Sequence, residues 1–149
     1  MKPLLEAARA KRAAFVFVGH PLRRDDGLGP YLAQRFKCGS TNHRVFDAGD
    51  ALEGVAEDII GFKPEIILIF DAAEFGGEPG EIRIFKPAEL KAGVSVSTHS
   101  IPLPVMAALL ESETGAEAFL VCVQLQDKSF GEGLAPPVAK AAESLLALL

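Results

Sequence analysis

Two aspartates and one histidine stand where apolar runs of the sequence give way to polar residues. Asp26 lies in the polar segment that follows the apolar run 13–19, and Asp71 closes the most apolar run of the chain. His99 lies in a polar loop ahead of a helix-like segment. Two carboxylates and one imidazole suit a divalent transition metal with open coordination positions. These residue types could serve metal recognition, metal-assisted hydrolysis or acid–base catalysis by a carboxylate.

Each of these side chains also has an ordinary structural interpretation. An aspartate at a strand end commonly accepts hydrogen bonds from nearby backbone amides, and the pair Asp25–Asp26 has the position of a helix cap. A histidine between serine residues, such as His99, is more often a loop residue than a ligand. Convergence of these side chains in the fold is what would distinguish a site from separate local features.

Short apolar runs alternate with amphipathic segments along the chain, which predicts strands alternating with helices. Pro30 is expected at the first position of the second helix, and Ser100 at the cap of the fourth. The predicted strands are 13–19, 44–47, 65–71, 81–85 and 118–124, and the predicted helices are a short one around 4–8, then 31–36, 52–60, 105–113 and 136–149.

This order predicts one α/β domain over residues 1–149, a three-layer α/β/α sandwich. Its twisted sheet is expected to have five strands, mostly parallel, with the alternating segment 81–85 as one antiparallel edge strand. In such sheets, ligands bind beyond the carboxyl ends of the strands. The predicted strand ends bring Asp47 and Asp71 to that edge, together with the loop that contains Asp26.

The composition supports one globular unit and excludes several function classes. The 149 residues are 49% hydrophobic and 23% charged, so a buried core is expected. Lys and Arg number 15 and Asp and Glu 20, and the net charge of −5 disfavours nucleic acid as a partner. We find no membrane-length apolar run and no signal core. The separated Cys38 and Cys122 form no disulfide framework, so we expect an inert pair of thiols in a cytoplasmic monomer.

Two other classes of site find less support. The glycine after the first predicted strand is typical of nucleotide-binding folds, but 19–24 contains no G-x-G-x-x-G and no P-loop lysine follows. Aspartates in that loop would repel a pyrophosphate, although Arg23 and Arg24 partly compensate. A nucleophilic hydrolase is disfavoured because there is no G-x-S-x-G elbow.

Three motifs, in the right order, resemble the hydrogenase maturation endopeptidases, which trim the large subunit of nickel–iron hydrogenases. That family has a strand ending in Gly-Asn, then Gly-Asp-Asp-Gly-x-Gly and a helix, which 15–29 resembles. Its central strand ends in Val-Asp-Ala before a Gly-x-x-Gly turn, as in 69–82, and its Thr-His-x-x-Pro-Leu motif matches 98–103. The resemblance extends over most of the chain, from about residue 15 to the final helix.

The resemblance implies roles for individual residues. Asp26, Asp71 and His99 match the positions that bind the metal in that family, and Asp26 and Asp71 are the expected catalytic carboxylates. Asp25, Asp47 and His20 are expected to contact these ligands rather than the metal. No other cofactor-binding residue is implied: nickel arrives with the substrate, and zinc or cadmium would be its surrogate in the same site.

The sequence departs from the family pattern at three positions. His20 replaces the usual asparagine, Arg24 replaces a glycine before the aspartate pair, and Leu125 follows Gln124 where the family often has proline. These changes leave the expected ligands intact, but they affect the loops that surround the site.

The resemblance implies a peptidase that removes a C-terminal extension from the precursor of a hydrogenase large subunit after nickel insertion, with the substrate's nickel as the recognition element. The chemistry of the site leaves an aspartic and a metal-assisted mechanism open. One alternative is a catalytically silent assembly factor that binds the metal or the precursor. Another is a flavodoxin-like domain that binds a nucleotide or flavin.

Overall fold

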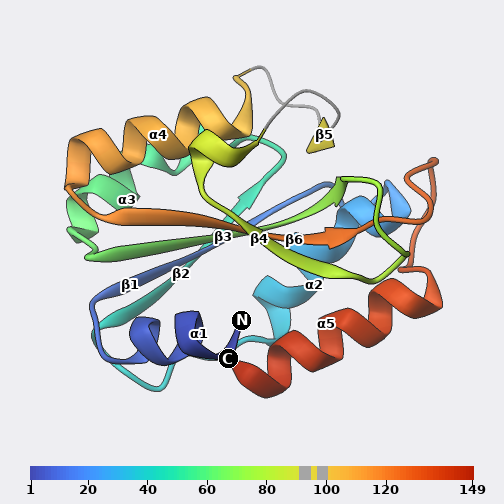
Figure 1. Cartoon of the computed structure of the whole chain (residues 1–149), viewed down its shortest axis with the longest axis horizontal. Helices are drawn as coiled ribbons and strands as arrows, with labels where there is room; N and C mark the ends of the chain where they lie inside the picture. Colours follow the sequence, from blue (N-terminus) through green and yellow to red (C-terminus); the bar gives the residue numbers. More distant parts are fainter. Residues whose placement is uncertain (91–94, 97–100) are drawn as a thin grey trace.

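The computed structural model describes residues 1–90, 95–96 and 101–149. A central sheet lies between two layers of helices (Figure 1). The strands are β1 (Ala13–Val18), β2 (His43–Gly49), β3 (Ile66–Glu74), β4 (Ile82–Phe85), β5 (Ser95–Val96) and β6 (Glu117–Gln124). The helices are α1 (Lys2–Arg9), α2 (Leu28–Arg35), α3 (Ala56–Phe62), α4 (Leu103–Thr114) and α5 (Pro136–Leu148), with 3-10 turns η1 (Arg24–Gly27), η2 (Leu52–Gly54) and η3 (Pro87–Glu89).

The sheet has the order β2-β1-β3-β6-β4. β1, β2, β3 and β6 pair in parallel, whereas β4 pairs antiparallel with β6 at the edge. The short β5 lies off this order and pairs antiparallel with the end of β3. The predicted fold class, a mostly parallel five-stranded sheet with one antiparallel edge strand, is therefore confirmed.

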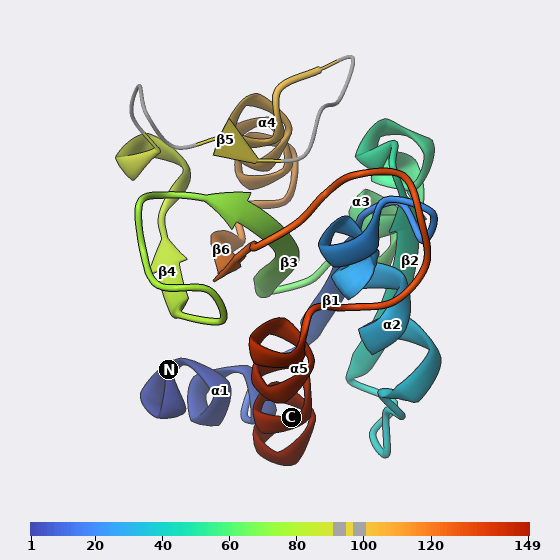
Figure 2. The same cartoon turned by 90° about the vertical axis from the view of Figure 1, so that its right-hand side faces the viewer.

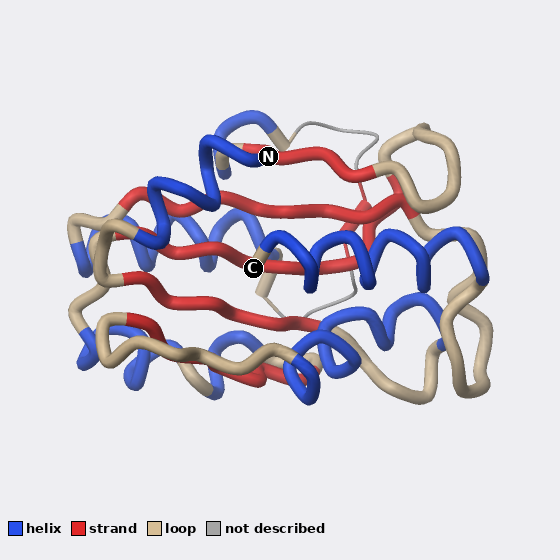
Figure 3. Tube along the Cα trace, turned by 90° about the horizontal axis from the view of Figure 1, so that it is seen from below, coloured by secondary structure: helices blue, strands red, loops and turns tan. Residues whose placement is uncertain are grey.

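The core has one apolar cluster on each face of the sheet, because the central strands are buried on both sides. Along β3, Ile67 and Ile69 pack with residues of α3 and α4, while Leu68 and Phe70 pack with residues of α1, α2 and α5. Figure 3 shows the second face, with α1 and α5 lying over the strands. The continuous apolar run that predicted this strand thus follows from its two buried faces.

Five details differ from the sequence predictions. The helix expected at 52–60 is divided into η2 and α3, because Gly54 weakens the helix between them. α2 begins at Leu28, so Pro30 is its third residue and not its first. Proline is tolerated there because a backbone N–H in the first turn has no acceptor within the helix. β2 continues past Asp47 to Gly49, and β3 continues past Asp71 to Glu74, because its pairing with β6 extends to Ala73. The cap of α4 is Pro102, and Ser100 lies outside the described residues.

No helix in the described part of the chain is long and apolar enough to cross a membrane.

Candidate active site

The chain reverses its direction of winding across the sheet between β1 and β3, which are neighbours although β2 lies between them in sequence. At such a point the connections that leave the two strands diverge and open a crevice at the carboxyl ends. Figure 2 looks onto this end of the sheet, where the segment after β1 and the long connection from β6 to α5 lie side by side. We call this end the carboxyl edge.

Asp26 lies in η1, at the carboxyl edge, and is 8% exposed. Its Oδ2 accepts a hydrogen bond from the backbone N–H of His20 at 3.1 Å, and its backbone oxygen accepts from the same N–H at 3.0 Å. This turn requires a glycine before it, because a Cβ at Gly19 would lie 1.9 Å from the backbone oxygen of Asp26. The strand end and its glycine therefore fix the position of Asp26.

Asp71 lies in β3, is fully buried and pairs in register with Cys122 of β6. Burial is the main cause that raises the pKa of the Cys122 thiol, and the nearby negative charge of Asp71 raises it further. The carboxylate therefore lies next to a thiol that keeps its proton. η1 packs against β3, so the segments that carry Asp26 and Asp71 are in contact.

Asp25 has a different environment from its neighbour Asp26. It is fully buried, and its Oδ2 accepts the backbone N–H groups of Gln126 and Asp127 at 2.8 and 2.7 Å. Its Oδ1 accepts the N–H of Ala135 at 2.7 Å. Oδ2 of Asp25 thus binds the start of the connection 126–135, and Oδ1 binds its end. Among the described residues, the side chain of Asp26 accepts only the one bond from His20.

The structure places the other expected site residues as follows. His20 is half-buried, and its Nδ1 accepts the backbone N–H of Leu22 at 3.1 Å. Asp47 is exposed and pairs with Phe17, so β1 lies between it and β3. His99 lies outside the described residues. Within 1–90, 95–96 and 101–149, no three His, Cys, Asp or Glu side chains form a group that could hold a metal ion.

Comparison with known proteins identifies the family. Residues 28–149 match the family model of HycI, the hydrogenase maturation protease. This chain belongs to the hydrogenase maturation protease family. It is a peptidase by that membership, and the family assignment favours the protease prediction over the nucleotide- or flavin-binding alternative.

Similar maturation proteases come from bacteria and archaea. The hydrogenase 3 maturation protease of Escherichia coli K12 is 34% identical over 131 residues, which cover 86% of this chain and 82% of that protein. A putative hydrogenase maturation protease of Methanocaldococcus jannaschii is 26% identical over 135 residues, covering 83% and 79%. The crystal structure of the NiFe hydrogenase maturation protease HycI from Thermococcus kodakarensis KOD1 has a TM-score of 0.87 at 29% identity, covering 98% and 95%.

In this maturation protease, Arg24 adopts the left-handed conformation, with φ of 45°, where the family pattern has glycine. Its backbone N–H donates to the oxygen of Gly131 at 3.0 Å, and its Nε lies 3.6 Å from a carboxylate oxygen of Asp127. An L residue in this conformation is strained. These contacts offset the strain and join η1 to the connection 126–135.

Gln124 is a structural residue of this maturation protease for which the sequence analysis assigned no role. Its side chain is 3% exposed, accepts the backbone N–H groups of Phe75 and Gly77 and donates to Glu74. It therefore shapes the glycine-rich turn after β3. The signal available in the sequence was a polar residue ending an otherwise apolar strand.

The next residue, Leu125, donates its N–H to the oxygen of Ala73 at 3.1 Å, a bond that the proline common in the family lacks. This departure from the family pattern therefore adds one hydrogen bond between the ends of β3 and β6.

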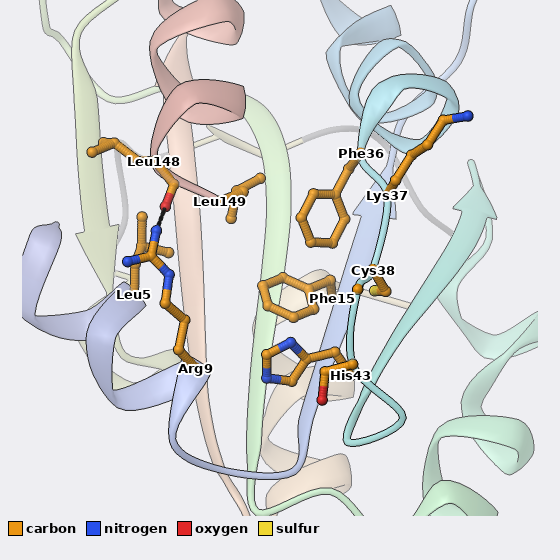
Figure 4. Close-up of a pocket in the computed structure, with 11 residues that line it drawn as sticks. Leu5, Arg9, Phe15, Phe36, Lys37, Cys38, His43, Leu148 and Leu149 are labelled. Carbon is orange, nitrogen blue, oxygen red and sulfur yellow. Dashed lines mark hydrogen bonds between the residues drawn. The ribbon is translucent and has the colours of Figure 1, made fainter.

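The maturation protease also has an apolar pocket of about 260 Å³ at the opposite end of the sheet (Figure 4). Phe15, Phe36 and Leu5 line it, and so does His43, whose Nε2 lies 3.1 Å from the backbone oxygen of Ala8. Cys38, which also lines it, has its pKa raised by burial. This pocket is remote from the carboxyl edge and contains none of the expected site residues.

Proposed function

We propose that this protein removes a C-terminal extension from the large-subunit precursor of a nickel–iron hydrogenase after nickel has been inserted. Its membership of the maturation protease family supports the choice of substrate. The observation that carries the proposal is the contrast between two adjacent carboxylates. Asp25 is saturated by backbone donors, whereas Asp26 accepts one bond at its side chain among the described residues and borders solvent.

Asp26, Asp71 and His99 are the proposed ligands for the nickel that the precursor carries. Two carboxylate oxygens and one imidazole nitrogen would complete the coordination of an ion that the substrate already holds, so a precursor without nickel would bind poorly. Recognition of the ion would thereby restrict cleavage to finished precursors. Zinc or cadmium would occupy the same position as a surrogate when added with the precursor.

The reaction is the hydrolysis of one peptide bond. In the aspartic form of the mechanism, Asp26 or Asp71 accepts a proton from the attacking water, and a proton is then delivered to the leaving amine nitrogen. In the metal-assisted form, the substrate's nickel polarises the scissile carbonyl, and the carboxylates position the ion. Both forms require Asp26 and Asp71.

Mass spectrometry of the precursor tests the proposal. Purified protein is incubated with nickel-loaded and nickel-free large-subunit precursor, and only the nickel-loaded sample should lose its C-terminal peptide. Asp26→Asn, Asp71→Asn and His99→Ala should each reduce the rate by at least about 100-fold. Asp58→Asn is the matched control, because Asp58 is an exposed aspartate of α3 that is not among the expected site residues.

Three results would count against the proposal. Normal trimming by the three site variants would remove Asp26, Asp71 and His99 from the mechanism. Trimming of nickel-free precursor at the same rate would remove the metal from recognition. Binding of the loaded precursor without cleavage by the wild type would instead identify a silent assembly factor.

A further inference from the structure

Two exposed apolar side chains lie on adjoining segments at the carboxyl edge. Phe130, in the connection from β6 to α5, is 82% exposed, and Leu22, in the segment after β1, is 38% exposed. Their segments are joined because the N–H of Gly131 donates to the oxygen of Leu22 at 2.8 Å. A single exposed apolar residue is common on protein surfaces, but two on interlocked segments form a local apolar surface.

The segment that carries Phe130 is held firmly although its side chain is exposed. Asp25 anchors both ends of the connection 126–135, as described above, and Arg24 binds its middle through Gly131. Close approach is possible because residue 131 is glycine: a Cβ there would lie 2.8 Å from the Arg24 guanidinium. An aromatic side chain on a segment that is already ordered loses little further conformational entropy when a partner covers it.

A groove of about 290 Å³ begins beside this apolar surface. Its lining includes Pro21, which is next to Leu22 in sequence, together with Tyr31 of α2 and Ala139 of α5. Its wall includes the connection 126–135, through Gly133 and Leu134. The exposed ring of Phe130 can enter a recess of a partner surface, and the groove can receive a side chain that projects from the partner.

The same backbone segment links this surface to the proposed site. The N–H of Leu22 donates to Nδ1 of His20, and the N–H of His20 donates to Oδ2 of Asp26. A precursor whose nickel reaches Asp26 must therefore lie against the segment that carries Leu22. The exposed basic residues here are Arg23, Arg35 and Lys128. They outnumber the two exposed acids, Glu132 and Glu143, of which Glu143 accepts a hydrogen bond from the Tyr31 hydroxyl in the groove. The charges of Arg24 and Asp127 offset each other.

We propose that Phe130, Leu22 and the groove beside Pro21 form the docking surface for the hydrogenase large-subunit precursor. This inference rests on the proposed function and specifies where the precursor binds outside the proposed site. This surface is complementary to a partner segment that carries apolar side chains and has an acidic residue beside them. Docking holds the precursor while its nickel reaches the carboxylates, so Phe130 contributes to binding and takes no part in hydrolysis.

Steady-state trimming of nickel-loaded precursor by Phe130→Ala tests the docking surface. We expect KM to rise about 10- to 30-fold with kcat within about twofold of the wild type, the loss typical of a central aromatic contact. Phe130→Leu should recover most of the affinity. Leu109→Ala is the control, because Leu109 is a 46% exposed apolar residue on α4. Circular dichroism should show that all variants melt as the wild type does.

Direct binding of nickel-loaded precursor, measured by interferometry, separates this inference from the proposed function. Wild type that binds but does not cleave refutes the proposed peptidase alone, and weaker binding by Phe130→Ala still supports the docking surface. Equal binding by the wild type, Phe130→Ala and Leu109→Ala overturns it, and so does wild type that does not bind the precursor. A wild-type dimer in analytical ultracentrifugation that Phe130→Ala converts to monomers also overturns it, because the surface would then serve self-association.

Discussion

The adjacent aspartates Asp25 and Asp26 should respond in opposite ways to substitution. Asp25 accepts three backbone N–H bonds of 2.7 to 2.8 Å, and each charge-assisted bond contributes about 1.5 to 3 kcal/mol net. The three are not additive, because freed amides of Gln126 and Asp127 can reach water. We therefore expect Asp25→Ala to lower the free energy of unfolding by about 3 to 5 kcal/mol, a large fraction of the 5 to 15 kcal/mol typical of a domain.

Asp25→Asn should cost about 2 to 3 kcal/mol, because its amide group places donors where the site needs acceptors. Asp26→Asn should change stability by no more than about 1 kcal/mol, since the side chain accepts a single bond from His20 and the amide oxygen can still accept it. In activity we expect the reverse order: Asp26→Asn should abolish trimming, whereas folded Asp25→Asn should retain it.

Urea denaturation followed by circular dichroism measures the stabilities, and hydrogen exchange reports on the individual amides. In Asp25→Asn, the amides of Gln126, Asp127 and Ala135 should exchange faster than in the wild type, whereas they should not change in Asp26→Asn. The reasoning is refuted if Asp25→Asn unfolds within about 0.5 kcal/mol of the wild type with these amides still protected.

Two further predictions concern the end of β6. The Cys122 thiol has its pKa raised above the ordinary 9.0 by burial and by Asp71, so the folded state keeps a proton that the unfolded state loses. Above about pH 9, the free energy of unfolding of the wild type should therefore fall by about 1.4 kcal/mol per pH unit relative to that of Cys122→Ala. Urea titrations from pH 7 to 10.5 measure both stabilities. If the two plots of stability against pH are parallel, this prediction is wrong. Leu125→Pro removes the hydrogen bond to Ala73 and should destabilise the protein by about 1 kcal/mol in the same assay. Leu125→Ala is the control, because it keeps the backbone N–H. If both variants lose the same stability, the effect comes from the leucine side chain and not from the hydrogen bond.

The sequence predicted the layers and the mostly parallel sheet well, because the burial of a strand leaves a direct mark on its composition. A strand covered on both faces, such as β3, must be apolar throughout, and the alternating segment that became β4 has one exposed face. The break within the helix predicted at 52–60 was less visible, since its apolar spacing continues across Gly54.

The separate roles of Asp25 and Asp26 could not be predicted from spacing. Two neighbouring acids look equivalent in the sequence, and what distinguishes them is a connection about 100 positions later that returns to Asp25. The same holds for Arg24, whose left-handed backbone is supported by Gly131 from that connection. The assignments of Asp26, Asp71 and His99 as site residues, and of the metal, stay predictions.

The trimming of nickel-loaded precursor by wild type, Asp26→Asn and Asp25→Asn tests the central claim most directly. The account predicts that mass spectrometry shows the shortened large subunit with wild type, none with folded Asp26→Asn, and the shortened product again with Asp25→Asn at a temperature where it is folded. Full trimming by Asp26→Asn would contradict the account.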